Sequence, residues 1–184
     1  MTLPLHASKV VAGALFAFCL ASPLHAEMTL TSPDIAPDST IGDAFVFNGF
    51  GCTGPNTSPA LAWEGAPEGT NSYIVNVYDP DAPTGSGFWH WAVFDLPASV
   101  TELPQGAAID LPEGAMQARN DYSANNWGGP CPPQGDTPHR YIFTVYAMPQ
   151  EKLGIDETAS GAVVGFFANT SALDSASFTA TYGR

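Results

Sequence analysis

The segments Tyr73-Ile74-Val75-Asn76-Val77-Tyr78 and Tyr141-Ile142-Phe143-Thr144-Val145-Tyr146 decide the fold class of this chain. Both are rich in the aromatic and β-branched residues that favour strands. Both also carry apolar side chains on each of their two faces, which is the pattern of strands covered on two sides. We therefore expect these segments to be central strands and to form the core.

Shorter apolar runs surround these two segments and predict further strands at residues 44–47, 89–96 and 178–182. The chain contains 17 prolines and 18 glycines, which divide it into short segments. Turn signals at such intervals are typical of an all-β sandwich or barrel.

One helix is predicted near the end of the chain, over residues 156–168, with Asp156 and Glu157 in the first turn, where negative charge is favoured. Apolar residues recur there at helical spacing, namely Ile155, Ala159, Val163 and Phe166 or Phe167. The stretch 104–129 has weak periodicity and is expected to be a long ordered loop, a kind of segment that is often functional. The chain should thus be mostly β, with one or two short helices near the C-terminus.

The first residues have the pattern of a secretory signal peptide. Lys9 precedes an uncharged run over 10–21, and Ser22-Pro23-Leu24-His25-Ala26 offers a cleavage point after Ala26. The run is shorter than the roughly 20 residues that a spanning helix needs, and no later apolar stretch approaches that length. We expect a signal peptide at 1–26, a single domain at 27–184, a periplasmic or secreted location and no stable membrane insertion.

The excess of acidic over basic residues argues against some classes of binding partner. The sequence has 5 Lys and Arg against 18 Asp and Glu, and loss of Lys9 with the signal peptide leaves 4 − 18 = −14. Such a charge repels nucleic acid and anionic membranes, so nucleic acid is not an expected partner. Any bound anion must be held by local donors.

Two cysteines remain after the signal peptide, Cys52 and Cys131. An even number in an oxidising compartment favours a disulfide. Chain-entropy reasoning gives such a bridge roughly 4 kcal/mol of stabilisation. Two free buried thiols are the alternative, since an even count does not establish that the two residues are close in space.

Two histidines also remain, and each follows a proline-rich loop that opens a predicted strand. The first segment reads Asp79-Pro80-Asp81-Ala82-Pro83-Thr84-Gly85-Ser86-Gly87-Phe88-Trp89-His90. The second reads Gly128-Gly129-Pro130-Cys131-Pro132-Pro133-Gln134-Gly135-Asp136-Thr137-Pro138-His139-Arg140-Tyr141. This placement favours a pair of imidazoles that line one pocket, with a buried structural histidine as the alternative.

Together the two segments resemble the signature motifs of the phosphatidylethanolamine-binding protein (PEBP) family, in its bacterial branch of Raf-kinase-inhibitor-like proteins. The similarity covers most of the chain, through Phe45, Cys52, Asn56, Ser58-Pro59, Trp63 and Tyr146 to Tyr182-Gly183-Arg184. It implies an antiparallel β-sandwich with a pocket for a small anion or phosphorylated head group. It also implies a cis peptide at Pro83. Carried over by position, the ligand-binding residues are Asp79, Asp81, Pro83, Trp89, His90, Gly129, Pro132, His139 and Tyr141.

The two acids of the first loop are not equivalent candidates. Asp79 is as well explained by capping its own loop as by contact with a ligand, so Asp81 is the stronger functional candidate. Gly128 and Gly129 are expected to bring backbone N–H groups close to an oxyanion.

The strands that follow the loops predict which side chains share a face. Regular alternation would place Ala92 on the face of His90, which also fits a core histidine. His139 shares its face with Tyr141, whereas Arg140 points the other way and is expected to form a structural ion pair.

Carboxylates and imidazoles in one pocket suit a small zwitterion, with acids facing an amine and imidazoles facing an oxyanion. The leading prediction is therefore a binding protein without a cofactor. A protease or kinase inhibitor that acts on a protein partner is the alternative. A hydrolase or metal-dependent enzyme is a weaker alternative, because the sequence has neither a nucleophile motif nor a short-spaced pair of metal ligands.

Overall fold

The computed structural model describes residues 27–184, so the predicted signal peptide at 1–26 lies outside the described residues. Within that range no helix is long and apolar enough to cross a membrane. The elements in chain order are β1 (Thr29–Thr31), the 3-10 helix η1 (Asp43–Phe45), β2 (Asn48–Gly49), β3 (Cys52–Thr53), β4 (Leu61–Glu64), β5 (Ser72–Asp79), β6 (Phe88–Pro97), β7 (Glu102–Leu103), β8 (Met116–Gln117), β9 (His139–Met148), α1 (Gly161–Ser171) and β10 (Asp174–Tyr182).

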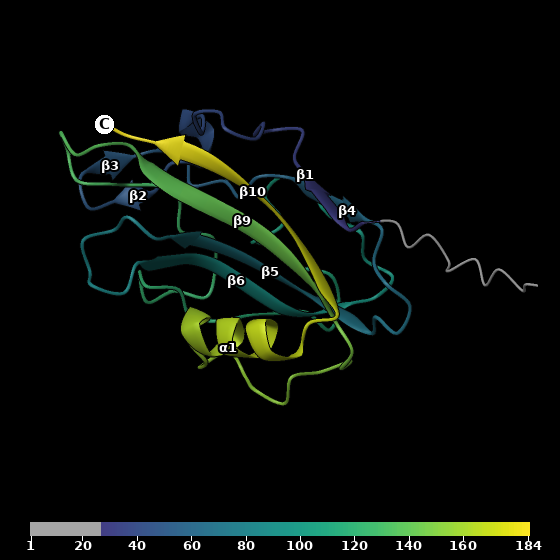
Figure 1. Cartoon of the computed structure of the whole chain (residues 1–184). Helices are drawn as coiled ribbons and strands as arrows, with labels where there is room; N and C mark the ends of the chain where they lie inside the picture. The colour runs from purple at the N-terminus through teal and green to yellow at the C-terminus, as the bar shows by residue number, and fades with distance from the viewer. Residues whose placement is uncertain (1–26) are drawn as a thin grey trace, which may run out of the picture.

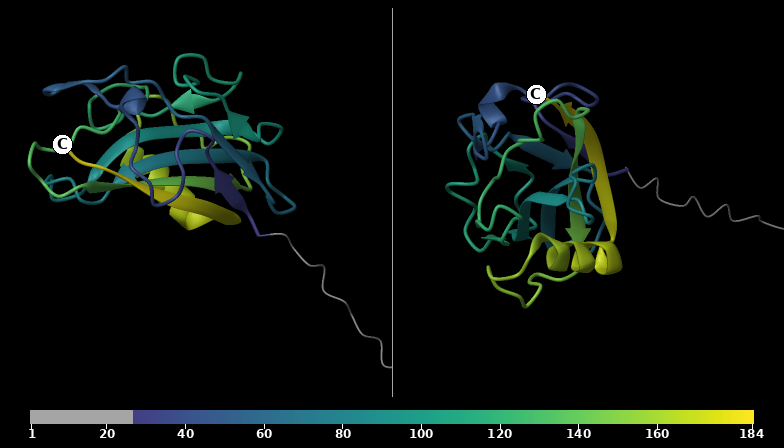
Figure 2. Two further views of the ribbon diagram at one scale, coloured as in Figure 1. Left: turned by 90° about the horizontal axis from the view of Figure 1, so that it is seen from above. Right: turned by 90° about the vertical axis from the view of Figure 1, so that its left-hand side faces the viewer.

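A five-stranded antiparallel sheet in the order β10-β9-β5-β6-β8 forms the centre of the domain. Strand β5 pairs with β6 on one side and with β9 on the other, so the prediction of central strands is confirmed. The three-stranded sheet β1-β4-β7 covers one face of the large sheet, and α1 lies against the opposite face (Figures 1 and 2). The predicted antiparallel sandwich is therefore confirmed.

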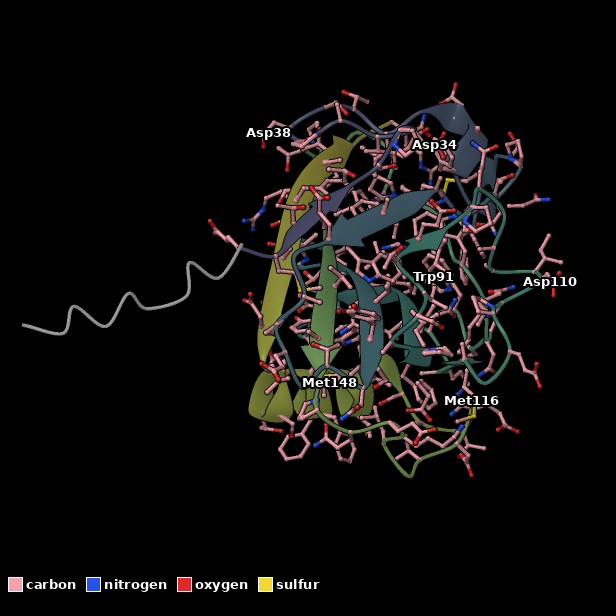
Figure 3. All side chains as sticks on the ribbon, turned by 90° about the vertical axis from the view of Figure 1, so that its right-hand side faces the viewer. Asp34, Asp38, Trp91, Asp110, Met116 and Met148 are labelled. Carbon is pink, nitrogen blue, oxygen red and sulfur yellow. A yellow bond between two sulfur atoms is a disulfide. The ribbon has the colours of Figure 1, made fainter. Side chains whose placement is uncertain are left out.

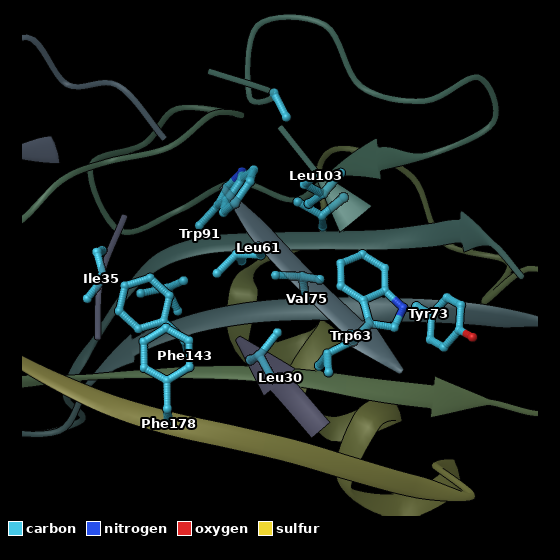
Figure 4. Packing of buried hydrophobic residues seen from close by; sticks show 14 of the residues in the cluster. Leu30, Ile35, Leu61, Trp63, Tyr73, Val75, Trp91, Leu103, Phe143 and Phe178 are labelled. Carbon is cyan, nitrogen blue, oxygen red and sulfur yellow. The ribbon is translucent and has the colours of Figure 1, made fainter. Parts of the chain in front are cut away.

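The large sheet buries apolar side chains on both faces, as its sequence pattern predicted. Leu61, Trp91 and Phe143 belong to the core between the sheets, where the rings of Phe143 and Phe178 stack with centroids 4.8 Å apart (Figure 4). A smaller core under α1 contains Met148 (Figure 3). The surface by contrast carries outward-pointing acids such as Asp110 (Figure 3).

The helix begins five residues later than predicted and buries a different face. Ser160 caps it by accepting a hydrogen bond from the Val163 amide at 3.3 Å, so the helix starts at Gly161. Its buried positions are Gly161, Val164, Gly165 and Ala168, whereas Val163 and Phe166 are 41% and 63% exposed. The expected apolar face was therefore wrong, because small residues let α1 approach the sheet closely.

Trp89 explains why glycine is needed on that face. A Cβ atom at Gly161 would lie 2.6 Å from Cγ of Trp89, and one at Gly165 would lie 2.7 Å from Cη2 of the same ring. These distances are far below van der Waals contact. The Trp89 side chain thus lies between β6 and α1.

Residues 44–47 do not form the predicted strand. Asp43–Phe45 is a 3-10 helix, and the backbone that follows bonds to loops instead of to a long strand. The Phe47 amide donates to the Pro130 carbonyl at 3.1 Å, and the Trp127 indole donates to the Phe45 carbonyl at 3.0 Å. Residues 104–129 do form the predicted long loop, apart from β8, which pairs with the edge of β6.

The predicted disulfide between Cys52 and Cys131 is confirmed. It joins strand β3 to the segment that precedes β9, across 79 residues of sequence. A loop of that length corresponds to roughly 4 kcal/mol of stabilisation in the chain-entropy account.

We predict that Gly161→Ala destabilises the domain, although alanine is the better helix former. The new methyl group would overlap Trp89, and overpacking of this kind costs about 1 to 3 kcal/mol. Gly42→Ala is the control, since its Cβ would meet only Phe45 Cε2 at 3.9 Å. Urea unfolding should show a lower midpoint for Gly161→Ala and a change within about 0.5 kcal/mol for Gly42→Ala. Equal stability of Gly161→Ala and wild type would contradict the packing described here.

Candidate ligand-binding site

A cavity of about 310 Å³ lies at one end of the large sheet. Asp79 ends β5, His90 lies near the start of β6, and His139 begins β9. Because these strands are antiparallel neighbours, the end of β5 and the starts of β6 and β9 meet at the same edge, on the left in Figure 1. The cavity is lined by side chains from all three strands and from the loops around them.

A β-bulge directs His90 into this cavity. In the pairing of β5 with β6, Val77 lies opposite Trp91 and Tyr78 lies opposite Trp89, so His90 is an extra residue without a partner. Trp89 therefore faces α1, while His90 and Trp91 both face the side of the sandwich core. The expectation that Ala92 shares the face of His90 was wrong for this reason, since Ala92 packs in the core under α1.

Asp79 is the residue that joins the three strands at the cavity. Its Oδ1 accepts hydrogen bonds from the backbone amides of Asp81 and Ala82, at 2.8 and 3.0 Å, and thereby caps the loop. Its Oδ2 accepts from Nδ1 of His139 at 2.7 Å and lies 3.9 Å from Nε2 of His90. One carboxylate thus performs both roles that the sequence left as alternatives.

Asp81 by contrast lies outside the cavity, so the preference for Asp81 over Asp79 was wrong. Its two oxygens accept from Nη2 and Nε of Arg140, at 2.7 and 2.8 Å, and one also accepts from the Arg140 amide. The guanidinium lowers the pKa of Asp81 to about 2. The structural ion pair predicted for Arg140 is confirmed.

The charges of Asp79 and His139 stabilise each other. Burial opposes ionisation of Asp79, but the hydrogen bonds that it accepts from His139 and from the Asp81 amide, together with the charge of His139, favour the carboxylate, so the pKa of Asp79 is lowered. Burial likewise opposes protonation of His139, yet Asp79 and then Asp136 outweigh it and raise its pKa. The pair is therefore a carboxylate and an imidazolium over the pH range between the two groups' ordinary pKa values.

Two polar atoms at the cavity are buried without a hydrogen-bond partner among the described residues. These are Nε2 of His90 and Oη of Tyr141. The other ring nitrogen of His90, Nδ1, lies 2.6 Å from the Gly128 carbonyl, which can only accept, so Nδ1 carries a proton. Burial raises the pKa of Tyr141, and the Asp79 charge raises it further, so the phenol keeps its proton.

Aromatic rings form one wall of the cavity. The ring of Tyr122 stacks on Phe47 with centroids 3.8 Å apart and meets the edge of Phe88 at 4.6 Å. Phe50 also lines the cavity, although it is 78% exposed. The cavity therefore has polar atoms at Asp79, His90 and Tyr141 and apolar rings beside them.

The rim contains Arg184, the one guanidinium among the described residues that line the cavity. Its guanidinium donates to the carbonyls of Pro132, Gly51 and Phe50, at 2.6, 3.1 and 3.4 Å. It thereby ties together the two loops that the disulfide also joins.

The structure brings most of the predicted site residues together at the cavity. Six of them line it, namely Asp79, Pro83, His90, Pro132, His139 and Tyr141. The peptide bond before Pro83 is trans, because the described residues contain no cis peptide, so the cis prediction was wrong.

Trp89 and Gly129 do not line the cavity. Trp89 lies under α1 because of the bulge. The Gly129 amide donates to Oδ1 of Asn56 at 2.8 Å, and a Cβ at Gly129 would collide with the Phe45 carbonyl. The glycine allows two backbone segments to approach closely, and its amide is not available to a ligand.

Several lining residues were not predicted, among them Phe50, Phe88, Asp121, Tyr122 and Arg184. Strand parity with His90 would have identified Phe88. Tyr122 and Asp121 belong to the long loop that was marked as a functional candidate without particular residues. Neither Phe50 nor Arg184 has a local sequence signal for the site.

Across residues 27–184, no group of three or more His, Cys, Asp or Glu side chains is arranged to hold a metal ion. The groups at the cavity are instead suited to hydrogen bonding. They comprise a buried carboxylate, two imidazoles and a phenol.

The sequence between residues 31 and 183 matches the family model described as phosphatidylethanolamine-binding protein. The chain therefore belongs to this family. It is 46% identical over 177 residues to the UPF0098 protein YbcL of Escherichia coli (strain K12), a match that covers 94% of this chain and 97% of YbcL. It is 48% identical over 158 residues to YbhB of the same organism, covering 84% of this chain and 99% of YbhB. The crystal structure of E. coli YbcL superimposes with a TM-score of 0.84 and covers 86% of this chain and 99% of that structure.

We predict that Asp79→Asn lowers the pKa of His139, since it removes the charge that offsets burial. The imidazole signal of His139 in an NMR pH titration measures this directly. Asp81→Asn is the matched control, because Asp81 lies on the same loop but pairs with Arg140, and it should change the titration much less. An unchanged His139 pKa in Asp79→Asn would contradict the described pairing.

The same pair predicts how stability depends on pH. The lowered pKa of Asp79 stabilises the fold above about pH 4, and that contribution is lost as pH falls through the folded value. The raised pKa of His139 stabilises the fold below about pH 6.5, and that contribution is lost as pH rises through the folded value. The difference in unfolding free energy between wild type and Asp79→Asn should therefore be larger near pH 5.5 than near pH 8.5.

Proposed function

We propose that this member of the family is an exported binding protein whose cavity takes a small oxyanion, with phosphorylated zwitterions such as phosphoethanolamine as the ligand class. The main support for this proposal is that two buried atoms at the cavity, Nε2 of His90 and Oη of Tyr141, have no hydrogen-bond partner among the described residues. Leaving such a group unsatisfied costs about 1 to 3 kcal/mol. A ligand that supplies partners to both atoms recovers that free energy on binding.

The charges around the cavity support a zwitterion over a simple anion. Asp79 and His139 compensate each other, and Arg184 at the rim is balanced by Asp121, which also lines the cavity. A ligand with both a positive and a negative group leaves this balance unchanged. The rings of Phe50, Phe88 and Tyr122 offer an apolar surface to the carbon atoms between the two groups.

Binding is favoured over covalent catalysis by the partners of the two imidazoles. Within the described range, the ring nitrogens of His90 and His139 lie near a backbone carbonyl and the carboxylates of Asp79 and Asp136. Neither ring is hydrogen-bonded to a hydroxyl or thiol, as an activated nucleophile would be. We therefore propose that the protein is not an enzyme.

Export is supported by the sequence before residue 27 and by the disulfide. The disulfide of Cys52 and Cys131 suits an oxidising compartment. A periplasmic or secreted location with a small-molecule partner is thus part of the proposal.

We predict that Tyr141→Phe abolishes most of the affinity for phosphoethanolamine without destabilising the protein. The change removes a hydroxyl that has no partner within residues 27–184, so the unfolding free energy should stay constant or rise. Loss of a hydrogen bond to a charged ligand costs about 1.5 to 3 kcal/mol, or roughly 10- to 150-fold in affinity. Isothermal titration calorimetry and urea unfolding measure the two effects.

Tyr146→Phe is the control for this prediction. Tyr146 lies on the same strand, β9, but packs against the core under α1 and does not line the cavity. The affinity of the Tyr146→Phe variant for phosphoethanolamine should equal that of the wild-type protein. Wild-type affinity in Tyr141→Phe would contradict the proposed role of the cavity.

Expression of the full chain in a bacterial host tests the proposal of export. We expect the protein in the periplasmic fraction, with an intact mass that starts at Glu27 and is lower by two hydrogens than that of the reduced form. A cytoplasmic protein that retains residues 1–26 would contradict this proposal.

A further inference from the structure

The hydrogen bond of His90 to the Gly128 carbonyl indicates which kind of ligand group the other ring nitrogen can bind. The Gly128 carbonyl lies 2.6 Å from Nδ1 and can only accept, so the ring proton is held on Nδ1 in the neutral imidazole. Nε2 then carries a lone pair and is an acceptor. The atom of His90 that is buried and unpartnered at the cavity thus calls for a ligand group that donates a hydrogen bond.

Tyr141 offers a hydrogen-bond donor beside the acceptor at His90. Its ring meets that of His90 edge-on, with centroids 5.0 Å apart, and its Oη carries the phenolic proton. The cavity therefore presents an acceptor at His90 and a donor at Tyr141. A group in which one oxygen is protonated and another is not satisfies both atoms at once.

The negative charge of Asp79 also favours a protonated ligand oxygen at His90 over an unprotonated one. Oδ2 of Asp79 lies 3.9 Å from Nε2 of His90, so an unprotonated oxygen placed on Nε2 would face both a lone pair and a carboxylate. His139 offsets the Asp79 charge but directs Nδ1 at Asp79, with Nε2 3.5 Å from Asp136. Arg184 directs its guanidinium at three backbone carbonyls. The remaining titratable groups that line the cavity, Asp121 and Tyr122, add no positive charge.

We propose that the cavity recognises the acidic hydroxyl of a monoprotonated oxyanion, namely the P–OH group of a phosphomonoester in its monoanionic form. This proposal rests on the function proposed above and specifies its ligand. The P–OH group donates to Nε2 of His90, and an unprotonated oxygen of the same phosphate accepts from Oη of Tyr141. Sulfate esters of the same shape lack the proton and leave the His90 lone pair unsatisfied.

A pair of ligands that differ in this one proton tests the proposal on the wild-type protein. Phosphoethanolamine and ethanolamine O-sulfate have the same ammonium arm. At about pH 5.5 both oxyanions carry mainly one negative charge, since a phosphomonoester loses its second proton near pH 6. Calorimetry at that pH should show the phosphate ester binding at least about tenfold more tightly, because a site that hydrogen-bonds a ligand hydroxyl discriminates strongly against an analogue without it.

A second pH separates this mechanism from attraction by a protonated His90. At about pH 8 the phosphate ester is a dianion without the P–OH proton, so its advantage over the sulfate ester should disappear. Loss of the His139 charge as pH rises weakens the binding of both esters, so the ratio of the two affinities is the quantity that tests the mechanism. If His90 acted as an imidazolium, the sulfate ester would bind as tightly as the phosphate ester at pH 5.5, and the ratio of the two affinities would be close to one at that pH.

Tyr141→Phe provides an internal control, because the phenol donates to both esters. It should weaken both and leave their ratio at pH 5.5 unchanged. Equal affinities of the two esters for the wild type at pH 5.5 would overturn the proposed proton recognition while leaving the anion pocket in place. Failure of both esters to bind would overturn the proposed function as well.

Discussion

The site depends on one buried carboxylate, that of Asp79. One of its oxygens caps the loop after β5, and the other accepts a hydrogen bond from His139 at the start of β9 and faces His90 on β6. The side chains of Asp79 and His139 are each only 3% exposed, so neither charge is well solvated without the other. Removing one partner of such a pair typically costs about 3 to 5 kcal/mol. The contact that holds three strand ends together is therefore also the contact that sets the electrostatics of the cavity.

Local departures from regular structure shape the rest of the cavity. The bulge at His90 rotates that side chain to the side of the cavity and places Trp89 under α1, where glycines make room for it. The disulfide and Arg184 tie the loops at the rim to each other. Of the buried side-chain atoms without partners among the described residues, two lie at the cavity, and their cost in stability fits the proposed role of the cavity in binding a ligand.

The sequence was sufficient for the parts of the fold that follow from simple periodicity. Strands β5 and β9 are apolar on both faces and could be placed at the centre of the sheet from that property alone. The two proline-rich loops, each followed by a histidine, were placed at one pocket mainly by the family resemblance, and the structure brings their histidines together at the cavity. The resemblance in the two motifs supplied the family.

Other features could not be read from periodicity. The bulge at His90 changes which residues of β6 share a face, so regular alternation placed Ala92 on the wrong face. The buried face of α1 is made of small residues at the expected spacing, but larger apolar residues on the solvent side masked it. Asp79 and Asp81 differ in role because of tertiary contacts with His139 and Arg140, which short-range sequence does not contain.

A crystal structure of the protein with phosphoethanolamine would test the central claim most directly. The account predicts phosphate oxygens within about 3 Å of both Nε2 of His90 and Oη of Tyr141, with the Asp79–His139 pair unchanged. A phosphate group bound elsewhere on the protein, or a cavity in which both atoms are satisfied by water in the presence of saturating ligand, would contradict it.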